Sequence, residues 1–228
     1  MSMPFYVSPD QLMKDRAEFA RKGIARGRSV VTARYRDGIV FVAANASRSL
    51  HKISEIYDQI GFGAVGRYHE FESLRVTGVR YADLRGYAYD RSDVAARGLV
   101  NSYAQLLGAA FSSGGDKPLE VELVVAEVGL EAADDTIFRI SFDGTVAESE
   151  DLLVIGGSAE TLEHALSAHH DPEASLGTVL REAVTGLLGE TPDPGDIEAA
   201  VLDRTRVQPR KFARLSTDAV AQLMGGQD

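Results

Sequence analysis

The sequence contains no cysteine and no tryptophan among its 228 residues. Without cysteine, the chain forms neither a disulfide framework nor a thiolate catalytic or metal site. Its uninterrupted apolar runs fall short of the roughly 20 residues that a membrane-spanning helix needs. Residues 1–10 also lack the basic start and long apolar stretch of a secretory signal peptide. We therefore expect a cytoplasmic globular protein.

Positive charge is also scarce, because 24 Lys and Arg stand against 34 Asp and Glu, giving a net charge of −10 at pH 7. This excess argues against general nucleic-acid binding, since phosphates repel an acidic surface. The charges are unevenly spread: residues 10–36 hold eight basic and three acidic residues, and residues 116–163 hold two and thirteen. Two ordinary solvated faces explain this, and so do complementary surfaces that meet in a ring of identical copies.

Apolar periodicity and turn residues predict helices and strands in alternating groups. A helix is expected over 9–24, with Ser8 as N-cap, Pro9 at its first position and an apolar side formed by Leu12, Ala17, Phe19 and Ala20. Further helices are expected at 68–85, at 92–113, in a segment ending near 169, at 175–188 and at 216–224. Strands are expected at 29–34, 39–45, around 53–60, 119–128, 136–142, 145–148, 152–155, 197–203 and 211–215. The Asp143-Gly144 pair predicts a hairpin turn between 136–142 and 145–148. Paired helices and hairpin strands favour an α+β fold with two packed sheets between helix layers.

One glycine-rich turn is a candidate anion site. Gly156, Gly157 and Ser158 follow an apolar strand and precede a helix, where backbone N–H groups can hold a phosphate. The segment lacks the lysine of a phosphate loop and the third glycine of a dinucleotide fingerprint. A tight strand-to-helix turn with Ser158 as cap is the simpler interpretation. A stand-alone nucleotide or small-molecule enzyme remains the alternative.

Other chemistry is weakly signalled. His164, His169, His170 and Asp171 resemble metal ligands, but a spacing of five puts the first two on different helix faces, and no complete ligand set is present. We expect no metal and no cofactor. There is no Gly-x-Ser-x-Gly nucleophile turn. The residue types alone therefore predict no catalytic residue.

Several segments resemble proteasome α-subunits, most closely the bacterial, actinobacterial-type form. They are 20–31 (ARKGIARGRSVV), 47–58 (SRSLHKISEIYD), 85–91 (RGYAYDR) and 121–128 (VELVVAEV). Together with the order of elements, the resemblance spans nearly the whole chain. It implies the four-layer αββα sandwich of N-terminal-nucleophile hydrolases, with an N-terminal helix before the first strand. It also implies a heptameric α-ring that caps β-rings holding threonine peptidase sites, for ATP-dependent intracellular protein degradation.

Catalytic members of this family expose a threonine at the start of the first strand. Here that strand begins around Arg28, Ser29 and Val30, after an intact helix, and no threonine stands there. The resemblance therefore implies a non-catalytic component of a threonine-type endopeptidase complex, with a catalytic subunit of the same fold as the alternative. The chain also lacks the Tyr-Asp-Arg cluster of archaeal and eukaryotic α-subunits, so the details of their gate do not transfer.

Residues 1–8 (MSMPFYVS) carry no charged side chain, although termini are usually polar. In a seven-fold ring such tails would converge on one axis and bury one another. We predict a gate formed by this tail, with a frayed terminus as the alternative; its members are Met1, Ser2, Met3, Pro4, Phe5, Tyr6, Val7 and Ser8. Residues 9–228 are expected to form a single domain, in which the helix within 9–26 packs between ring neighbours.

Lys52 is a lone lysine in an apolar, strand-like segment, where an exposed edge-strand lysine is the simplest structural explanation. The family resemblance implies more. Lys52, with Gly27 and Gly66 nearby, would line a pocket between α-subunits that receives the C-terminal carboxylate of a ring-shaped AAA ATPase. The expected partners are thus other α-subunits, β-subunits, this ATPase and unfolded proteins in transit, without nucleic acid or membrane.

Overall fold

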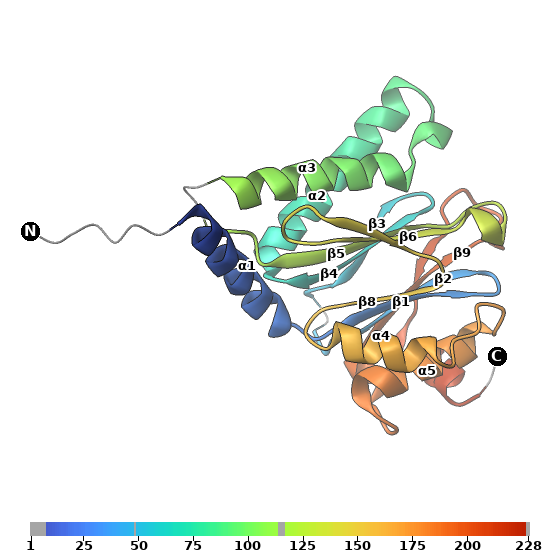
Figure 1. Ribbon diagram of the computed structural model, residues 1–228. Coiled ribbons are helices and arrows are strands. Elements are labelled where there is room, and N and C mark those ends of the chain that lie inside the picture. The colour runs from blue at the N-terminus through green and yellow to red at the C-terminus, as the bar shows by residue number, and fades with distance from the viewer. Residues whose placement is uncertain (1–7, 48, 114–116, 227–228) are drawn as a thin grey trace, which may run out of the picture.

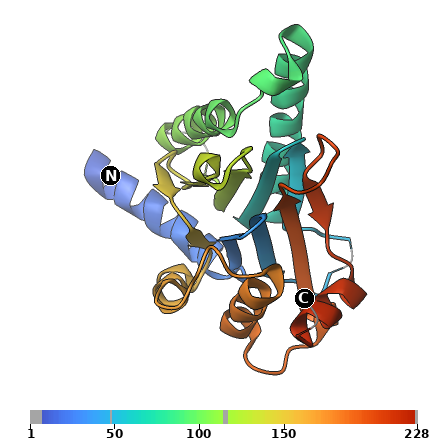
Figure 2. The same ribbon diagram turned by 90° about the vertical axis from the view of Figure 1, so that its right-hand side faces the viewer.

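The computed structural model describes residues 8–47, 49–113 and 117–226. Two five-stranded antiparallel sheets pack face to face, and helices cover the outer face of each (Figure 1). The strand order is β10-β9-β2-β1-β8 in the first sheet and β3-β4-β5-β6-β7 in the second. A view turned by 90° places the two helical layers on opposite sides of the sheets (Figure 2). The predicted αββα sandwich is confirmed.

The first sheet contains β1 (Val30–Tyr35), β2 (Gly38–Ala44), β8 (Leu152–Ile155), β9 (Ile197–Asp203) and β10 (Phe212–Arg214). The second contains β3 (Ile53–Tyr57), β4 (Ile60–Gly66), β5 (Val121–Glu127), β6 (Thr136–Ile140) and β7 (Val146–Ser149). The helices are α1 (Pro9–Ala25), α2 (Tyr68–Ala88), α3 (Ala96–Ser112), α4 (Ala159–Ser167), α5 (Leu176–Leu188) and α6 (Thr217–Met224). Helices α2 and α3 cover the second sheet, and α4, α5 and α6 cover the first.

The central strand β2 shows why the core has layers. Ile39 and Phe41 point into the cluster between the two sheets, whereas Val40 and Val42 pack under the helices of the first sheet. Successive side chains of a strand point to opposite faces of the sheet, and both faces of β2 are buried from solvent. An unbroken apolar sequence is therefore required, and each large side chain buried there contributes about 1.5–3 kcal/mol before ordering costs.

Helix α1 crosses one end of the sandwich (Figure 1). It begins as predicted, because the Ser8 hydroxyl accepts a hydrogen bond from the Gln11 backbone N–H and Pro9 follows the cap. Arg16 then ties the helix to α3 by donating from Nε to the Phe111 carbonyl at 3.0 Å. This contact uses a carbonyl at the end of α3, where backbone acceptors lack partners within the helix.

The structure corrects three local predictions. The helix expected from residue 92 begins at Ala96, because residues 91–93 form a separate 3₁₀ turn and the Glu127 carboxylate accepts the Ala96 N–H at 2.7 Å. Ser158 occupies the N-cap position of α4, but its side chain makes no capping hydrogen bond. Leu12 and Phe19, expected on the apolar side of the first helix, are 45% and 44% exposed. Strand β4 continues to Gly66, beyond the segment around 53–60 in which short strands were expected, and the other predicted elements agree within a few residues at each end.

Candidate functional site

Lys52 lies directly before β3, the edge strand of the second sheet. Its carbonyl accepts the Ala64 N–H at 3.0 Å, and its Nζ donates to the carbonyl oxygen of Arg28 at 2.7 Å. The lysine therefore bridges the start of β3 and the segment that joins α1 to β1. The simplest sequence interpretation, an exposed edge-strand lysine, is wrong in one respect: the side chain is half-buried and hydrogen-bonded.

Gly27 and Gly66 lie against each other next to this contact. A Cβ at Gly27 would stand 2.4 Å from Val65 Cγ1 and 3.4 Å from the Gly66 nitrogen. Gly66 itself has a φ of +122°, and a Cβ there would stand 1.9 Å from the Glu120 carbonyl oxygen, so only glycine fits. The structure thus brings Lys52, Gly27 and Gly66 together, with Arg28 as the link, whereas their docking role stays a prediction.

The charge of Lys52 is finely set by its surroundings. The pKa of the Lys52 ammonium is lowered to about 8: burial is the largest cause, the Glu198 carboxylate raises the pKa in opposition, and the nearby Arg28 guanidinium adds a smaller lowering. Burial dominates because desolvation disfavours the charged form of an amine. The side chain is therefore mostly a cation at neutral pH, and it loses this charge at a lower pH than an ordinary lysine.

Sequence reasoning missed the residue beneath this lysine. Glu198, on β9, is buried at 7% exposure, and its Oε2 accepts the Lys52 backbone N–H at 2.9 Å. One signal was available in the sequence, since Glu198 is the single charged residue in the apolar run 197–202. A lone carboxylate in a buried strand needs partners, because burying an unpaired charge is very costly.

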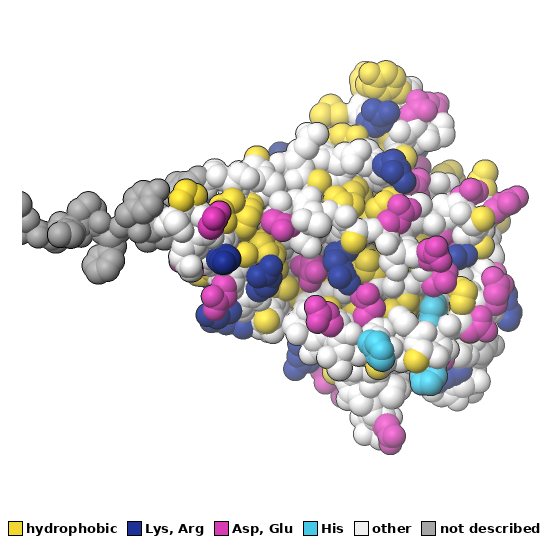
Figure 3. Space-filling model, in the orientation of Figure 1, with side chains coloured by type: hydrophobic (Ala, Val, Ile, Leu, Met, Phe, Trp, Pro, Cys, Tyr) yellow, Lys and Arg dark blue, Asp and Glu magenta, His cyan; other side chains and the backbone are white. Residues whose placement is uncertain are grey.

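A pocket of about 800 Å³ opens beside Gly27 and Arg28, and Leu162 of α4 and Leu188 of α5 line its other side. It shares Arg28 with the Lys52 hydrogen bond, so an apolar wall and a basic group adjoin. In the space-filling view, Lys and Arg side chains gather over α1 with some acidic groups among them, and acidic side chains outnumber basic ones over the rest of this face (Figure 3). The uneven charge of the sequence is therefore also uneven on this surface.

The glycine turn after β8 packs against the end of α1. The Gly156 N–H donates to Glu122 Oε2 at 2.9 Å, and a Cβ at Gly157 would stand 2.4 Å from the Ala25 carbonyl oxygen. One donor of the turn is thus occupied by a carboxylate, and the approach of α1 needs the missing side chain. These contacts support the simple turn interpretation over a phosphate cradle.

The start of β1 bears on peptidase chemistry. The described chain continues from α1 through Arg28 and the buried Ser29 into the strand. Thr32 lies inside β1, is fully buried and pairs with Phe41 and Leu153 on the neighbouring strands. Its hydroxyl has no hydrogen-bond partner among the described residues. Thr32 is therefore a core residue and not an exposed nucleophile.

Within the described ranges, no group of three or more His, Cys, Asp or Glu side chains is arranged to hold a metal ion. Among those same residues, no helix is both long and apolar enough to cross a membrane. Of the predicted gate, residues 1–7 lie outside the described part, and Ser8 is the N-cap of α1.

Comparisons with known proteins agree on one family. Residues 24–188 match the family model described as proteasome subunit. The chain is 59% identical to a protein of Nocardioides sp. over 99% of this chain and 90% of that protein. It is 58% identical to one from Sanguibacter keddieii (98% and 90%) and 55% identical to one from Kineococcus radiotolerans (99% of each). All three relatives are named proteasome subunit alpha.

Proposed function

The chain belongs to the proteasome subunit family and is a non-catalytic α-ring subunit, and from this premise we propose how it works. It forms a heptameric ring that caps the β-rings, gates the entry of unfolded proteins through its N-terminal tails, and docks a ring-shaped AAA ATPase in the cytoplasm. The observation that carries the docking proposal is the hydrogen bond from Lys52 Nζ to the Arg28 carbonyl oxygen.

Lys52 suits a carboxylate ligand. An ammonium has three donors, so the bond to Arg28 fixes its place and leaves donors for a second acceptor. A hydrogen bond between an ammonium and a carboxylate contributes about 1.5–3 kcal/mol. One such contact is weak, but several tails on one activator ring gain affinity through their effective concentration. The adjoining pocket beside Gly27 offers apolar walls to the residues that precede the carboxylate.

Helix α1 is the proposed contact between ring neighbours. Leu12, Met13 and Phe19 are 38–45% exposed in the single chain, although the same helix buries Ala20 and Ile24 against the sandwich. Large exposed apolar groups along one helix are typical of an interaction surface. A neighbouring subunit in a ring would cover them.

The gate proposal rests on the composition of residues 1–8 and on the place where α1 begins. Burying each apolar tail side chain at the ring axis would contribute about 1.5–3 kcal/mol, and ordering the tail costs a similar amount. The closed state is then marginal. An activator that favours the open state can shift such a balance.

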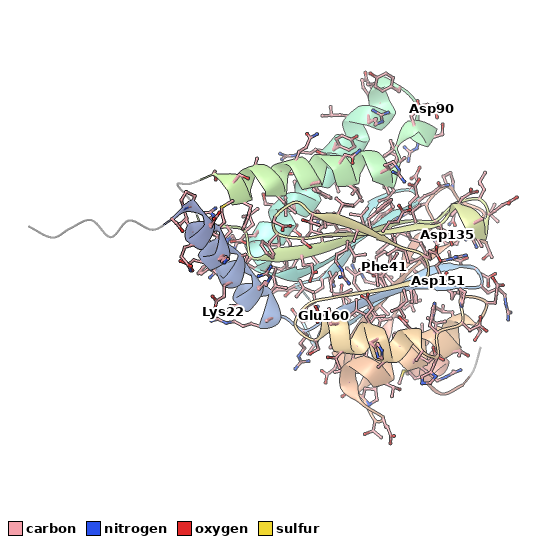
Figure 4. The ribbon with its side chains drawn as sticks, viewed as in Figure 1. Lys22, Phe41, Asp90, Asp135, Asp151 and Glu160 are labelled. Atoms are coloured by element: carbon pink, nitrogen blue, oxygen red, sulfur yellow. The ribbon has the colours of Figure 1, made fainter. Side chains whose placement is uncertain are left out.

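The opposite end of the molecule is the proposed contact with β-subunits. Leu84, Tyr87 and Tyr89, at the end of α2, are 70%, 93% and 74% exposed. In Figure 4, Lys22 on α1 and Asp90 beside this tip lie on opposite sides of the molecule. If α1 and the docking site face the activator, the aromatic tip faces the other way.

One experiment tests the docking proposal. The chain is produced with β-type subunits, and degradation of an unfolded protein is measured with a ring-shaped AAA ATPase and ATP. Lys52→Ala should abolish the stimulation while the particle keeps its size and its unstimulated peptide hydrolysis. Lys14→Ala, which removes an exposed lysine on α1, is the matched control and should keep the stimulation. Full stimulation of Lys52→Ala would refute the assignment.

A further inference from the structure

Glu198 joins the two sheets at the point where the docking lysine stands. It lies on β9 of the first sheet, opposite Ala43 of β2, and its carboxylate reaches across to the segment that enters β3 of the second sheet. The side chain is 6% exposed. A carboxylate so buried must be compensated by several donors, because an unpaired buried charge is very costly.

The donors around Glu198 come from three separate parts of the chain. Oε2 accepts the Lys52 backbone N–H at 2.9 Å and Asn45 Nδ2 at 2.7 Å. Oε1 accepts the Ile53 N–H at 3.2 Å and Arg214 Nη1 at 2.6 Å. The backbone N–H groups of the consecutive residues Lys52 and Ile53 both donate to this carboxylate. Glu198 therefore fixes the backbone on both sides of the Lys52 Cα.

Building on the proposed docking function, we propose that Glu198 is the positioning residue of that site: its carboxylate fixes the backbone of Lys52 and Ile53 and keeps the docking ammonium charged in its place. The two ends of Lys52 are thereby held independently. Glu198 holds the backbone, and the Arg28 carbonyl holds Nζ.

The charge of Glu198 matters as well as its shape. Charged groups facing this cluster are the Arg28 guanidinium near the ammonium, Arg214 on the carboxylate, and His51, whose Nδ1 lies 3.2 Å from Oε1. Of the groups acting on the Lys52 pKa, Glu198 is the one that raises it. Replacing the carboxylate alone would leave Arg214 and the backbone N–H groups of Lys52 and Ile53 without their acceptor. Its charge therefore acts both on the joint between the sheets and on the neighbouring ammonium.

The pH at which Lys52 titrates separates this proposal from a merely structural role of Glu198. If Glu198→Gln leaves the fold intact, the ammonium loses its favourable neighbour and Lys52 titrates at a lower pH. If the substitution loosens the segment instead, Lys52 becomes solvated and titrates at a higher pH, nearer an ordinary lysine. The two explanations thus predict opposite directions.

The experiment uses the full chain assembled with β-type subunits. Lys52 reactivity is followed with trace acetic anhydride from pH 6 to 10, with mass spectrometry of the labelled peptide. Wild-type Lys52 should titrate near the pH of about 8 that its surroundings set, and Glu198→Gln should titrate lower. A midpoint one pH unit lower would leave about five times less ammonium at pH 8. An unchanged or higher midpoint would overturn the proposal.

Two further variants keep the test decisive if Glu198→Gln assembles poorly. Glu198→Asp keeps the charge but shortens the reach, so it should keep a midpoint near that of the wild type. It should nevertheless bind a synthetic peptide with a free C-terminal carboxylate more weakly, and wild-type binding by this variant would contradict positioning. Arg214→Gln removes a donor to the same carboxylate and should not lower the midpoint.

Failure of the docking proposal itself remains distinguishable. If Lys52→Ala binds the free-carboxylate peptide as well as the wild type does, and no better than its amidated form, docking at this lysine is wrong. The labelling midpoint in Glu198→Gln still decides whether Glu198 controls Lys52.

Discussion

The Lys52 ammonium donates a hydrogen bond to the carbonyl oxygen of Arg28, and this 2.7 Å contact places the proposed docking group at the junction between α1 and β1. The same junction is where catalytic relatives would carry their threonine. In this chain, the backbone there is internal and serves as an acceptor. We propose that this junction serves recognition here, whereas the family resemblance implies covalent chemistry at the same place in catalytic members.

Docking should depend on pH through Lys52. Because its pKa is lowered to about 8, the ammonium is present below that pH and is lost above it. Binding of a free-carboxylate peptide should therefore weaken as the pH rises through about 8. Between about 8 and the ordinary lysine value, the unfolded chain binds more protons at Lys52 than the folded chain, so this residue's contribution to stability rises with pH.

Peptide binding measured from pH 6.5 to 9.5 checks this. Lys52→Arg provides the control, because a guanidinium stays charged across the whole range. If Lys52→Arg still binds the peptide, its affinity should show no transition near pH 8. A transition of equal size in Lys52→Arg would assign the pH dependence to another group.

Gly27→Ala should damage both packing and docking. The new methyl group would meet the buried Val65 side chain at 2.4 Å, and overpacking of this kind costs about 1–3 kcal/mol. Chemical denaturation measures the loss of stability, and peptide binding measures the site. Gly108→Ala on α3 is the control, since its Cβ would meet only an ordinary contact at 3.5 Å and should not destabilise the chain.

Sequence predicted the parts of the fold that short-range signals control. Ser8 and Pro9 start α1 because a cap and a first-turn proline act within a few residues. Gly144, with a φ of +84°, allows the turn between β6 and β7 that the Asp143-Gly144 pair predicted. The start of α3 was misplaced because its capping acceptor, Glu127, stands on a strand 31 residues away.

The site shows the same division. Lys52 and Gly27 lie in segments that resemble a known family, and Gly66 was placed beside them by the same resemblance, because their separate positions carry no shared local pattern. Glu198 was missed because 146 residues separate it from the Lys52 N–H that it accepts. A buried charge in an apolar strand indicates that partners exist, but only the fold identifies them.

Removing the tail should open the proposed gate. Deleting residues 2–7 while keeping Ser8 should raise hydrolysis of a short peptide by the assembled particle several-fold, because the apolar tails can no longer cover the axis. Ser8 must stay, since it caps α1 through Gln11 and losing a cap costs about 1 kcal/mol. Ser8→Ala with the full tail is therefore the control, and unchanged hydrolysis by the deleted form would refute the gate.

Phe19→Ser should weaken ring formation. The Phe19 side chain is 44% exposed on α1, and its burial between subunits would contribute about 1.5–3 kcal/mol at each contact. Light scattering coupled to size exclusion should show smaller species for the variant produced with β-type subunits. Leu130→Ser, which removes an 82% exposed apolar side chain after β5, should leave the particle intact. Equal sizes for both variants would argue against α1 as the ring contact.

Substituting the aromatic tip should separate α-rings from β-rings. Tyr87 and Tyr89 are largely exposed in the single chain. Burying a tyrosine against a partner is favourable, because its ring is large and its side chain loses little conformational entropy. The double variant Tyr87→Ser and Tyr89→Ser should leave the chain folded, since neither side chain is buried, but should reduce co-purification with β-type subunits. Leu50→Ser removes a 49% exposed apolar group near the docking site and should not affect this step. If the double variant co-purified with β-type subunits to the same extent as the wild type, and the complex dissociated at the same salt concentration, the β-facing surface would lie elsewhere.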